Sequence, residues 1–182
     1  MKKKKETYYS DYLKLDKILN AQDLKSEILD EPIHDEMLFI ITHQAYELWF
    51  KQIIHEIDSI ITLFKDSYID EKNLSFILNR LNRITMIQEV LISQIKILES
   101  MTPMDFLEFR NLLSPASGFQ SIQFRTIENK LGLKRKNRLK FSKKSYDEFL
   151  NNKDKEQARK SEDMENLFFY LEQWLERTPF IV

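Results

Sequence analysis

The longest patterned stretch of the chain is residues 34–64, HDEMLFIITHQAYELWFKQIIHEIDSIITLF. Apolar side chains recur in it at steps of three and four residues, the spacing that places them on one face of an α-helix. This seam consists of Leu38, Ile41, Ala45, Trp49, Ile53, Ile57, Ile60 and Phe64. The stretch therefore predicts one long helix, from about His34 to Phe64, whose seam faces a core.

A second long helix is predicted from about Asp70 to Ser100. Its apolar seam has the same spacing and a single polar member, Gln88, the others being Leu74, Ile77, Leu81, Ile84, Leu91, Ile95 and Leu98. Because only a short turn separates the two helices, we expect them to pack antiparallel.

Shorter helices are expected on both sides of this pair. One runs from about Ser10 to Asn20, with Ser10 as its N-cap. Residues 102–105, TPMD, are a start signal for a helix that ends near Leu113, because threonine caps it, proline takes the first position and a carboxylate follows.

The C-terminal third is less clearly patterned. A helix should follow Gly118 and end before Gly132, whose freedom to adopt a positive φ suits a helix terminus. Residues 137–160 are polar and charged and predict no element. The last helix is expected to begin near Ser161 and to end at Thr178, before Pro179.

Composition supports the same fold class. The 182 residues include only two Gly and four Pro, too few for many hairpin turns or glycine-rich phosphate loops, and 42% of them are hydrophobic. No repeat and no Pro-, Gly- or Ser-rich linker interrupts the chain. We expect one all-α domain over residues 1–182, a bundle of about six helices built on the two long antiparallel ones.

Several classes of protein are disfavoured. No apolar run approaches the roughly 18 to 20 residues of a membrane helix, and the basic start is not followed by a signal core, so a soluble cytoplasmic protein without a membrane partner is expected. The chain has no cysteine, which excludes thiol catalysis and thiolate-bound metals. Its formal net charge of -1 gives no sign of a nucleic-acid partner.

One stretch departs from this balance, since residues 130–144 contain eight basic residues and no acidic one. We expect a solvated, mobile surface segment. A phosphate-binding patch is the alternative, and it lacks the aromatic side chains that would stack on bases, Phe141 being alone.

Candidate functional residues must be found singly, because no GxGxxG, P-loop, HExxH or GxSxG motif is present. His43 and His55 are about three turns apart on the predicted helix, too far to bind one ion, so no metal site is predicted. His43 has Phe39, Tyr46 and Phe50 at helical spacing, an aromatic face that suits a flat apolar ligand with one N–H. Spacing alone favours a buried histidine bonded to Glu47.

Two further features are ambiguous in the same way. Arg110 lies in a mostly apolar helix, where its guanidinium can hold a ligand carboxylate or form an ion pair with Glu108 or another helix. Residues 114–121 form the only small-residue loop, in which Gly118 lets the backbone approach a ligand closely. A plain interhelical turn is the alternative.

Five segments in order resemble the tryptophan 2,3-dioxygenase family: YSDYLKLD at 9–16, HDEMLFIITHQAYELW at 34–49, MTPMDFLEFR at 101–110, SPASGFQSIQFR at 114–125 and WLERTP at 174–179. The resemblance implies a haem-dioxygenase-like all-α fold with haem as cofactor. It also implies a reaction, the insertion of both atoms of O₂ across the indole C2–C3 bond of L-tryptophan to give N-formylkynurenine.

The same resemblance implies residue roles. His43 matches a distal histidine that contacts the indole nitrogen, and Arg110 matches the arginine that binds the substrate carboxylate. Phe106 stands where some members have tyrosine. The remaining matches are Phe39, Ile40, Ile41 and Thr42 in the substrate pocket, Ser117 and Gly118 beside the haem, and Tyr9, Tyr12 and Leu13 in a helix that completes a neighbouring subunit's pocket. A homotetramer is thereby implied.

Family members extend beyond the WLERTP segment, and their proximal haem histidine lies in that extension. His34 and His55 match no iron ligand of the family. The expectation is therefore a fragment, a truncated reading frame or one piece of a split enzyme. The alternative function is a catalytically inactive helical interaction module.

Overall fold

The computed structural model describes residues 6–30, 32–66, 69–138 and 145–178. Within these ranges every regular element is helical, which confirms the all-α fold, and no helix is long and apolar enough to cross a membrane. The α-helices are α1 Tyr9–Leu13, α2 Leu15–Ile18, α3 His34–Phe64, α4 Glu71–Leu98, α5 Pro103–Leu113, α6 Ile122–Leu131, α7 Asn152–Glu162 and α8 Leu167–Arg177, with 3-10 turns η1 Lys25–Ile28, η2 Gly118–Gln120 and η3 Arg135–Asn137.

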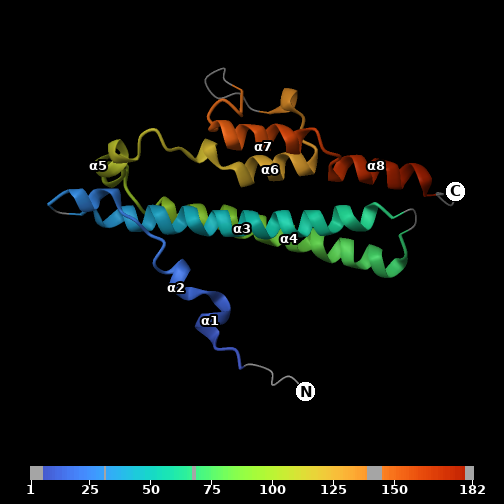
Figure 1. The fold of residues 1–182 in the computed structure, drawn as a ribbon, viewed down its shortest axis with the longest axis horizontal. Coiled ribbons are helices and arrows are strands. Elements are labelled where there is room, and N and C mark those ends of the chain that lie inside the picture. Colours follow the sequence, from blue (N-terminus) through green and yellow to red (C-terminus); the bar gives the residue numbers. More distant parts are fainter. Residues whose placement is uncertain (1–5, 31, 67–68, 139–144, 179–182) are drawn as a thin grey trace.

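The two long helices are confirmed. The bounds of α3 are those predicted, and α4 follows Asp70, whose carboxylate caps it by accepting a hydrogen bond from the Asn73 N–H at 2.6 Å. Helices α3 and α4 run antiparallel (Figure 1). Helices α6 and α8 pack on α3, and α7 packs on α6. The long helix α3 is thus the central element of the bundle.

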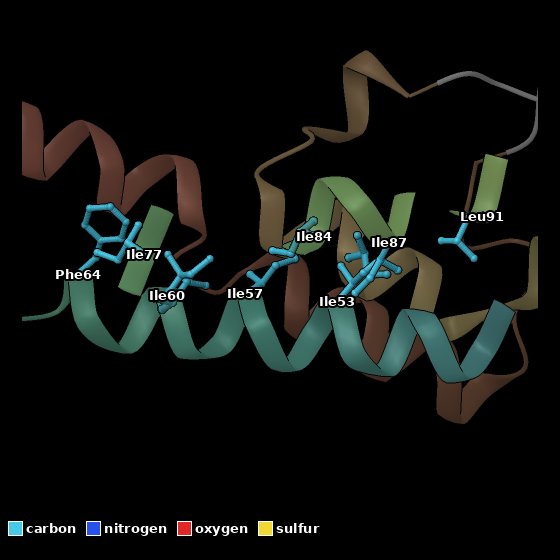
Figure 2. Packing of buried hydrophobic residues seen from close by; sticks show 10 residues of the cluster. Ile53, Ile57, Ile60, Phe64, Ile77, Ile84, Ile87 and Leu91 are labelled. Atoms are coloured by element: carbon cyan, nitrogen blue, oxygen red, sulfur yellow. The ribbon is translucent and has the colours of Figure 1, made fainter. Parts of the chain in front are cut away.

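The core lies along the second half of α3. Figure 2 shows Ile53, Ile57, Ile60 and Phe64 facing the side chains of α4. The predicted seam is wrong in its first half, because Ile41 is 48% exposed and Trp49 39%. Successive four-residue steps each rotate by about 40° around the helix, so Ile41 lies roughly 120° from Ile53.

The seam of α4 also differs from its prediction. Ile87, which the predicted seam omits, is buried, and Gln88 is exposed. Ile77, Ile84 and Leu91 are buried as predicted, whereas Ile95 is 45% exposed.

The N-terminal helix differs from its prediction. Lys14 adopts a left-handed conformation with φ 54° and divides it into α1 and α2, and α1 begins after Tyr8 without a side-chain cap, so Ser10 is not its N-cap. Neither piece buries a residue, and short helices without packing are marginal. Residues 6–21, the arm, project from the bundle in Figure 1 and are tethered through Gln22 and Gln44.

Helix α5 begins as its sequence predicts. Thr102 and Asp105 form a reciprocal capping box, with Pro103 in the first turn. Gly132 ends α6 with φ 91°, as expected. A Cβ at this glycine would meet Asn166 Oδ1 at 2.8 Å, so both the backbone conformation and the packing against α8 favour glycine there.

The C-terminal prediction is wrong in two respects. Residues 152–162 form α7, and Ser161 lies within that helix, so the last helix begins later, after its N-cap Asn166. Helix α7 has little apolar periodicity to reveal it, because its one buried side chain is the small, fully covered Ala158. Asn151 supplies its cap by accepting from the Asp154 N–H at 2.9 Å.

The basic stretch is also not a simple solvated segment. Arg138 is buried and donates to Glu128 and to the carbonyl of Leu133. Arg135 pairs with Glu162 at 2.9 Å and with Asp147 at 3.4 Å. Arg135 thus ties the segment after α6 to α7, and Arg138 ties it back to α6. Residues 139–144 of the stretch lie outside the described residues.

This ion-pair network should make the fold sensitive to acid. Burial alone would raise the pKa of Asp147, but hydrogen bonds from Ser145 and Arg159 and the charge of Arg135 outweigh it and lower the pKa to about 2. Because the pKa is depressed in the folded state, the stabilisation is present above the ordinary value of 3.8 and is lost as pH falls towards 2. Asp147 then contributes about 2 kcal/mol at neutral pH.

We therefore expect the free energy of unfolding, measured with urea, to fall as the pH is lowered from about 5 to about 2. In Asp147→Asn the fall should be smaller by about 2 kcal/mol. An unchanged pH dependence in this variant would show that Asp147 titrates normally.

Candidate functional site

A cleft of about 470 Å³ lies between the first half of α3 and residues 113–121, which join α5 to α6. Its lining includes His43 together with Ser117 and Gly118. Two segments that the sequence singled out separately, more than seventy residues apart, thus meet at one site.

One face of α3 forms the floor of the cleft. Glu36, Ile40, His43 and Glu47 follow one another at steps of four, three and four residues, so they share that face. Glu36 was not singled out from the sequence, and Glu47 was named only as a partner of His43. Their helical spacing from His43 was the signal that could have identified them.

The imidazole of His43 is fixed by its own helix. Its Nδ1 lies 2.7 Å from the carbonyl oxygen of Phe39. Because a carbonyl oxygen can only accept, Nδ1 carries the proton of the neutral ring, which leaves Nε2 as a hydrogen-bond acceptor. The predicted bond to Glu47 is not formed, since Glu47 accepts instead from Gln123 at 2.8 Å.

Aromatic rings extend from His43 towards α5. The Phe39 ring lies 4.1 Å from the imidazole and 5.6 Å from Phe106, centre to centre. The predicted aromatic face is only partly present, because Tyr46 donates its hydroxyl to the Leu91 carbonyl and Phe50 packs on Phe124. Both of these rings serve the core.

Arg110 lies at the far end of this series of rings. Its guanidinium carbon is 5.9 Å from the centre of the Phe106 ring, and the side chain is exposed. Among the described residues it forms no ion pair, so the structural pair with Glu108 that the sequence left open is not seen there. The cation does not line the cleft but is separated from it by Phe106 and Phe39.

The opposite wall of the cleft is the turn η2. The Ser117 side chain accepts from the Phe119 N–H at 3.3 Å, and Gln120 accepts from the Ser117 N–H at 3.1 Å. A Cβ added to Gly118 would meet no atom within 4 Å, so there is open space beside this backbone. A flat ligand can lie directly against it.

Glu36 closes one end of the cleft by holding the loop before α3. Its buried carboxylate accepts from the Lys25 N–H at 2.7 Å and from the Ser26 N–H at 2.8 Å. Burial raises the pKa of this carboxyl, but the hydrogen bonds from Ser26 and Lys25 outweigh it and the net pKa is lowered. Glu36 is therefore an ionised anchor of the cleft rather than a proton donor at neutral pH.

The other predicted site residues lie elsewhere. The Thr42 side chain is buried, with 3% exposure, and does not line the cleft. Ile41 lies on another face of α3. Tyr9, Tyr12 and Leu13 are exposed on the arm and contribute nothing to the cleft of this chain.

A larger groove, of about 1060 Å³, lies between α3 and α4 and is lined by Leu48, Trp49, Met86 and Val90 among others. The one ionisable side chain in its lining is Arg83, which pairs with Glu56 at 2.8 Å. Its chemistry is that of an apolar surface. The cleft, which holds an imidazole with an open acceptor nitrogen, is the better candidate for a reaction site.

The remaining histidines do not join His43. His34 and His55 are exposed and outside the cleft, and no group of His, Asp or Glu in the described ranges is arranged to hold a metal ion directly.

A family model described as tryptophan 2,3-dioxygenase matches residues 1–181. The chain is 53% identical over 177 residues to a protein of that name from Dictyostelium discoideum, an alignment that covers 97% of this chain and 44% of the relative. A namesake from Mayetiola destructor is 54% identical over 172 residues, 94% of the chain and 44% of the relative. The chain therefore spans less than half the length of these curated relatives.

Proposed function

Because the chain belongs to the tryptophan 2,3-dioxygenase family, we propose that it forms the substrate-facing part of a haem-dependent enzyme that cleaves the indole ring of L-tryptophan. The proposed reaction consumes O₂ and gives N-formylkynurenine. The observation that carries the proposal is the meeting of His43 with Ser117 and Gly118 in one cleft.

The residues of the cleft fit one face of a haem. Gly118 leaves open space for the edge of a flat ring, and His43, held through Nδ1 by the Phe39 carbonyl, has its Nε2 left for a ligand. His43 is the one histidine among the described residues that line the cleft, and it would serve the substrate and not the iron. When bound, the haem would supply the binding and activation of O₂.

The protein's own part is to place the substrate. Arg110 binds the carboxylate of tryptophan, because its planar guanidinium offers two parallel hydrogen bonds and has no ion-pair partner in the described part of the chain. Nε2 of His43 accepts the indole N–H, because Nδ1 is already committed to the Phe39 carbonyl. Phe39 and Phe106 lie between these two polar groups and keep water from the ring.

Assembly is part of the proposal. We propose a homotetramer in which Tyr9, Tyr12 and Leu13 of the arm complete the cleft of a neighbouring copy. The support is that these side chains are exposed and bury nothing in their own chain. The cytoplasmic location expected from the sequence stays a prediction.

The alternative, a helical interaction module without chemistry, rests on the groove between α3 and α4. It accounts for exposed Leu48 and Met86 but not for the fixed tautomer of His43. The cleft therefore favours the enzyme.

The proposal is tested in a chimaera in which this chain replaces the matching part of the Dictyostelium relative. We expect His43→Ala to lower kcat/KM for tryptophan roughly tenfold, because one hydrogen bond to the indole is lost. The matched control is His55→Ala, on the same helix but outside the cleft, which should stay within about twofold. Equal effects of the two substitutions would remove His43 from the site.

A further inference from the structure

The turn that carries Ser117 and Gly118 is held internally by short-range bonds. Besides the Ser117–Gln120 capping pair, the Gln120 side chain donates to the Pro115 carbonyl at 3.4 Å. All of these bonds join residues within 115–120, so they fix the shape of the turn without fixing its place relative to α3. Contacts from outside the turn must do that.

One such contact comes from the segment between α6 and α7. The Phe119 ring, which follows Gly118 directly, stacks on the Phe149 ring with centres 5.4 Å apart and planes 28° apart. Phe149 is about thirty residues away in sequence, in a segment whose polar composition predicted no element.

We call residues 145–151 the strap, and it is anchored on both sides of Phe149. Asp147, 1% exposed, accepts from Arg159 at 3.0 Å and from Arg135 at 3.4 Å. The Tyr146 ring lies 3.9 Å from the Arg138 guanidinium, and Leu150 is buried. The neighbours of Phe149 in the chain are therefore fixed to α7 and to the residues that follow α6.

From this arrangement we infer that Phe149 is a positioning residue, which sets the place of the Ser117–Gly118 wall through its ring contact with Phe119. The arginines of the basic stretch then have a role, because Arg135 and Arg138 hold the strap that carries Phe149. The positioning of the wall is independent of the proposed function. Only its consequence for a bound haem rests on that function.

The first test is hydrogen exchange in the chain of 182 residues. The amides of Gln120 and Ser121 donate to the Ser117 and Gly118 carbonyls at 2.9 and 3.1 Å. A short turn that loses its outside support should open more often, and the exchange of these two amides measures that opening. In Phe149→Ala their exchange should accelerate roughly tenfold, while amides in the middle of α3 and α4 keep wild-type rates. Phe149→Tyr, which keeps the ring, should restore wild-type exchange.

Two controls separate positioning from general loss of stability. Phe169→Ala removes a ring of the same size from α8, where it contacts Tyr170, and should leave the turn amides unchanged. Phe119→Ala should accelerate the turn amides as Phe149→Ala does, and the double variant should add little. Additive effects, or a uniform acceleration that reaches α3, would overturn the inference.

The second test measures haem binding by the chimaera, with haemin as the probe. Phe149→Ala should weaken binding several-fold and shift the Soret band, whereas Phe169→Ala should change neither. Faster turn exchange without any haem binding, even in the unsubstituted chimaera, would uphold the positioning of the wall and contradict the proposed function. If turn exchange is unchanged in Phe149→Ala and the unsubstituted chimaera binds haem normally, the positioning of the wall is contradicted and the proposed function is upheld.

Discussion

Replacing Arg110 by Ala in the chimaera is expected to lower kcat/KM for L-tryptophan roughly 100-fold, the largest loss for any single polar residue of the site. The carboxylate would lose a charge-assisted, two-point partner, and Lys25, a described cation that lines the cleft, is already paired with Asp23 at 2.7 Å. Arg110→Lys keeps the charge but not the planar fork, so it should recover only part of the loss.

Selectivity is the sharper readout for Arg110. Tryptamine, which lacks the carboxylate, should be a far poorer substrate than tryptophan for the unsubstituted chimaera and nearly equal to it for Arg110→Ala. Glu108→Ala on the same helix is the matched control and should preserve the preference. A variant without Arg110 that still prefers tryptophan would make this arginine structural.

Phe109→Ala should cost about 3–5 kcal/mol of unfolding free energy, the largest effect expected on stability. Phe109 is fully buried, and its ring meets Phe39 and Phe106 edge-on at 5.6 and 5.4 Å. It therefore holds α5 against α3 at the point where the aromatic series reaches Arg110. Truncation would leave a cavity between the two helices.

Chemical denaturation of the chain measures this loss. Leu107→Ala, on the same helix but 50% exposed, is the control and should change stability by less than about 1 kcal/mol. Similar losses for the two variants would mean that Phe109 does not anchor α5.

The sequence predicted those elements whose local signals agree with their packing. Helix α3 was predicted to the residue, and the capping box of Thr102 and Asp105 correctly placed the start of α5. Helix α7 was missed because its stability depends on Ala158 against α6 and on ion pairs, neither of which leaves a periodic pattern. The break at Lys14 was missed because it leaves no sequence signal, and no described residue of α1 or α2 is buried by packing that would favour a continuous helix.

The candidate site was predictable in its parts but not in its assembly. From the sequence, the alternative for His43 was a buried histidine and that for Gly118 was a plain interhelical turn. Only the fold brings the two residues to one cleft. The tautomer of His43 depends on the Phe39 carbonyl, and the sequence favoured Glu47 as its partner. The strap could not be predicted, because the contact between Phe119 and Phe149 joins two segments with no shared periodicity.

The central proposal is that this chain supplies the substrate-facing wall of a tryptophan-cleaving dioxygenase. The most direct measurement is mass spectrometry of the product formed from L-tryptophan and ¹⁸O₂ by the haem-loaded chimaera. We predict N-formylkynurenine that carries both labelled oxygen atoms, formed at a rate that falls with Arg110→Ala. A folded, haem-loaded chimaera that yields no doubly labelled product would contradict the proposal.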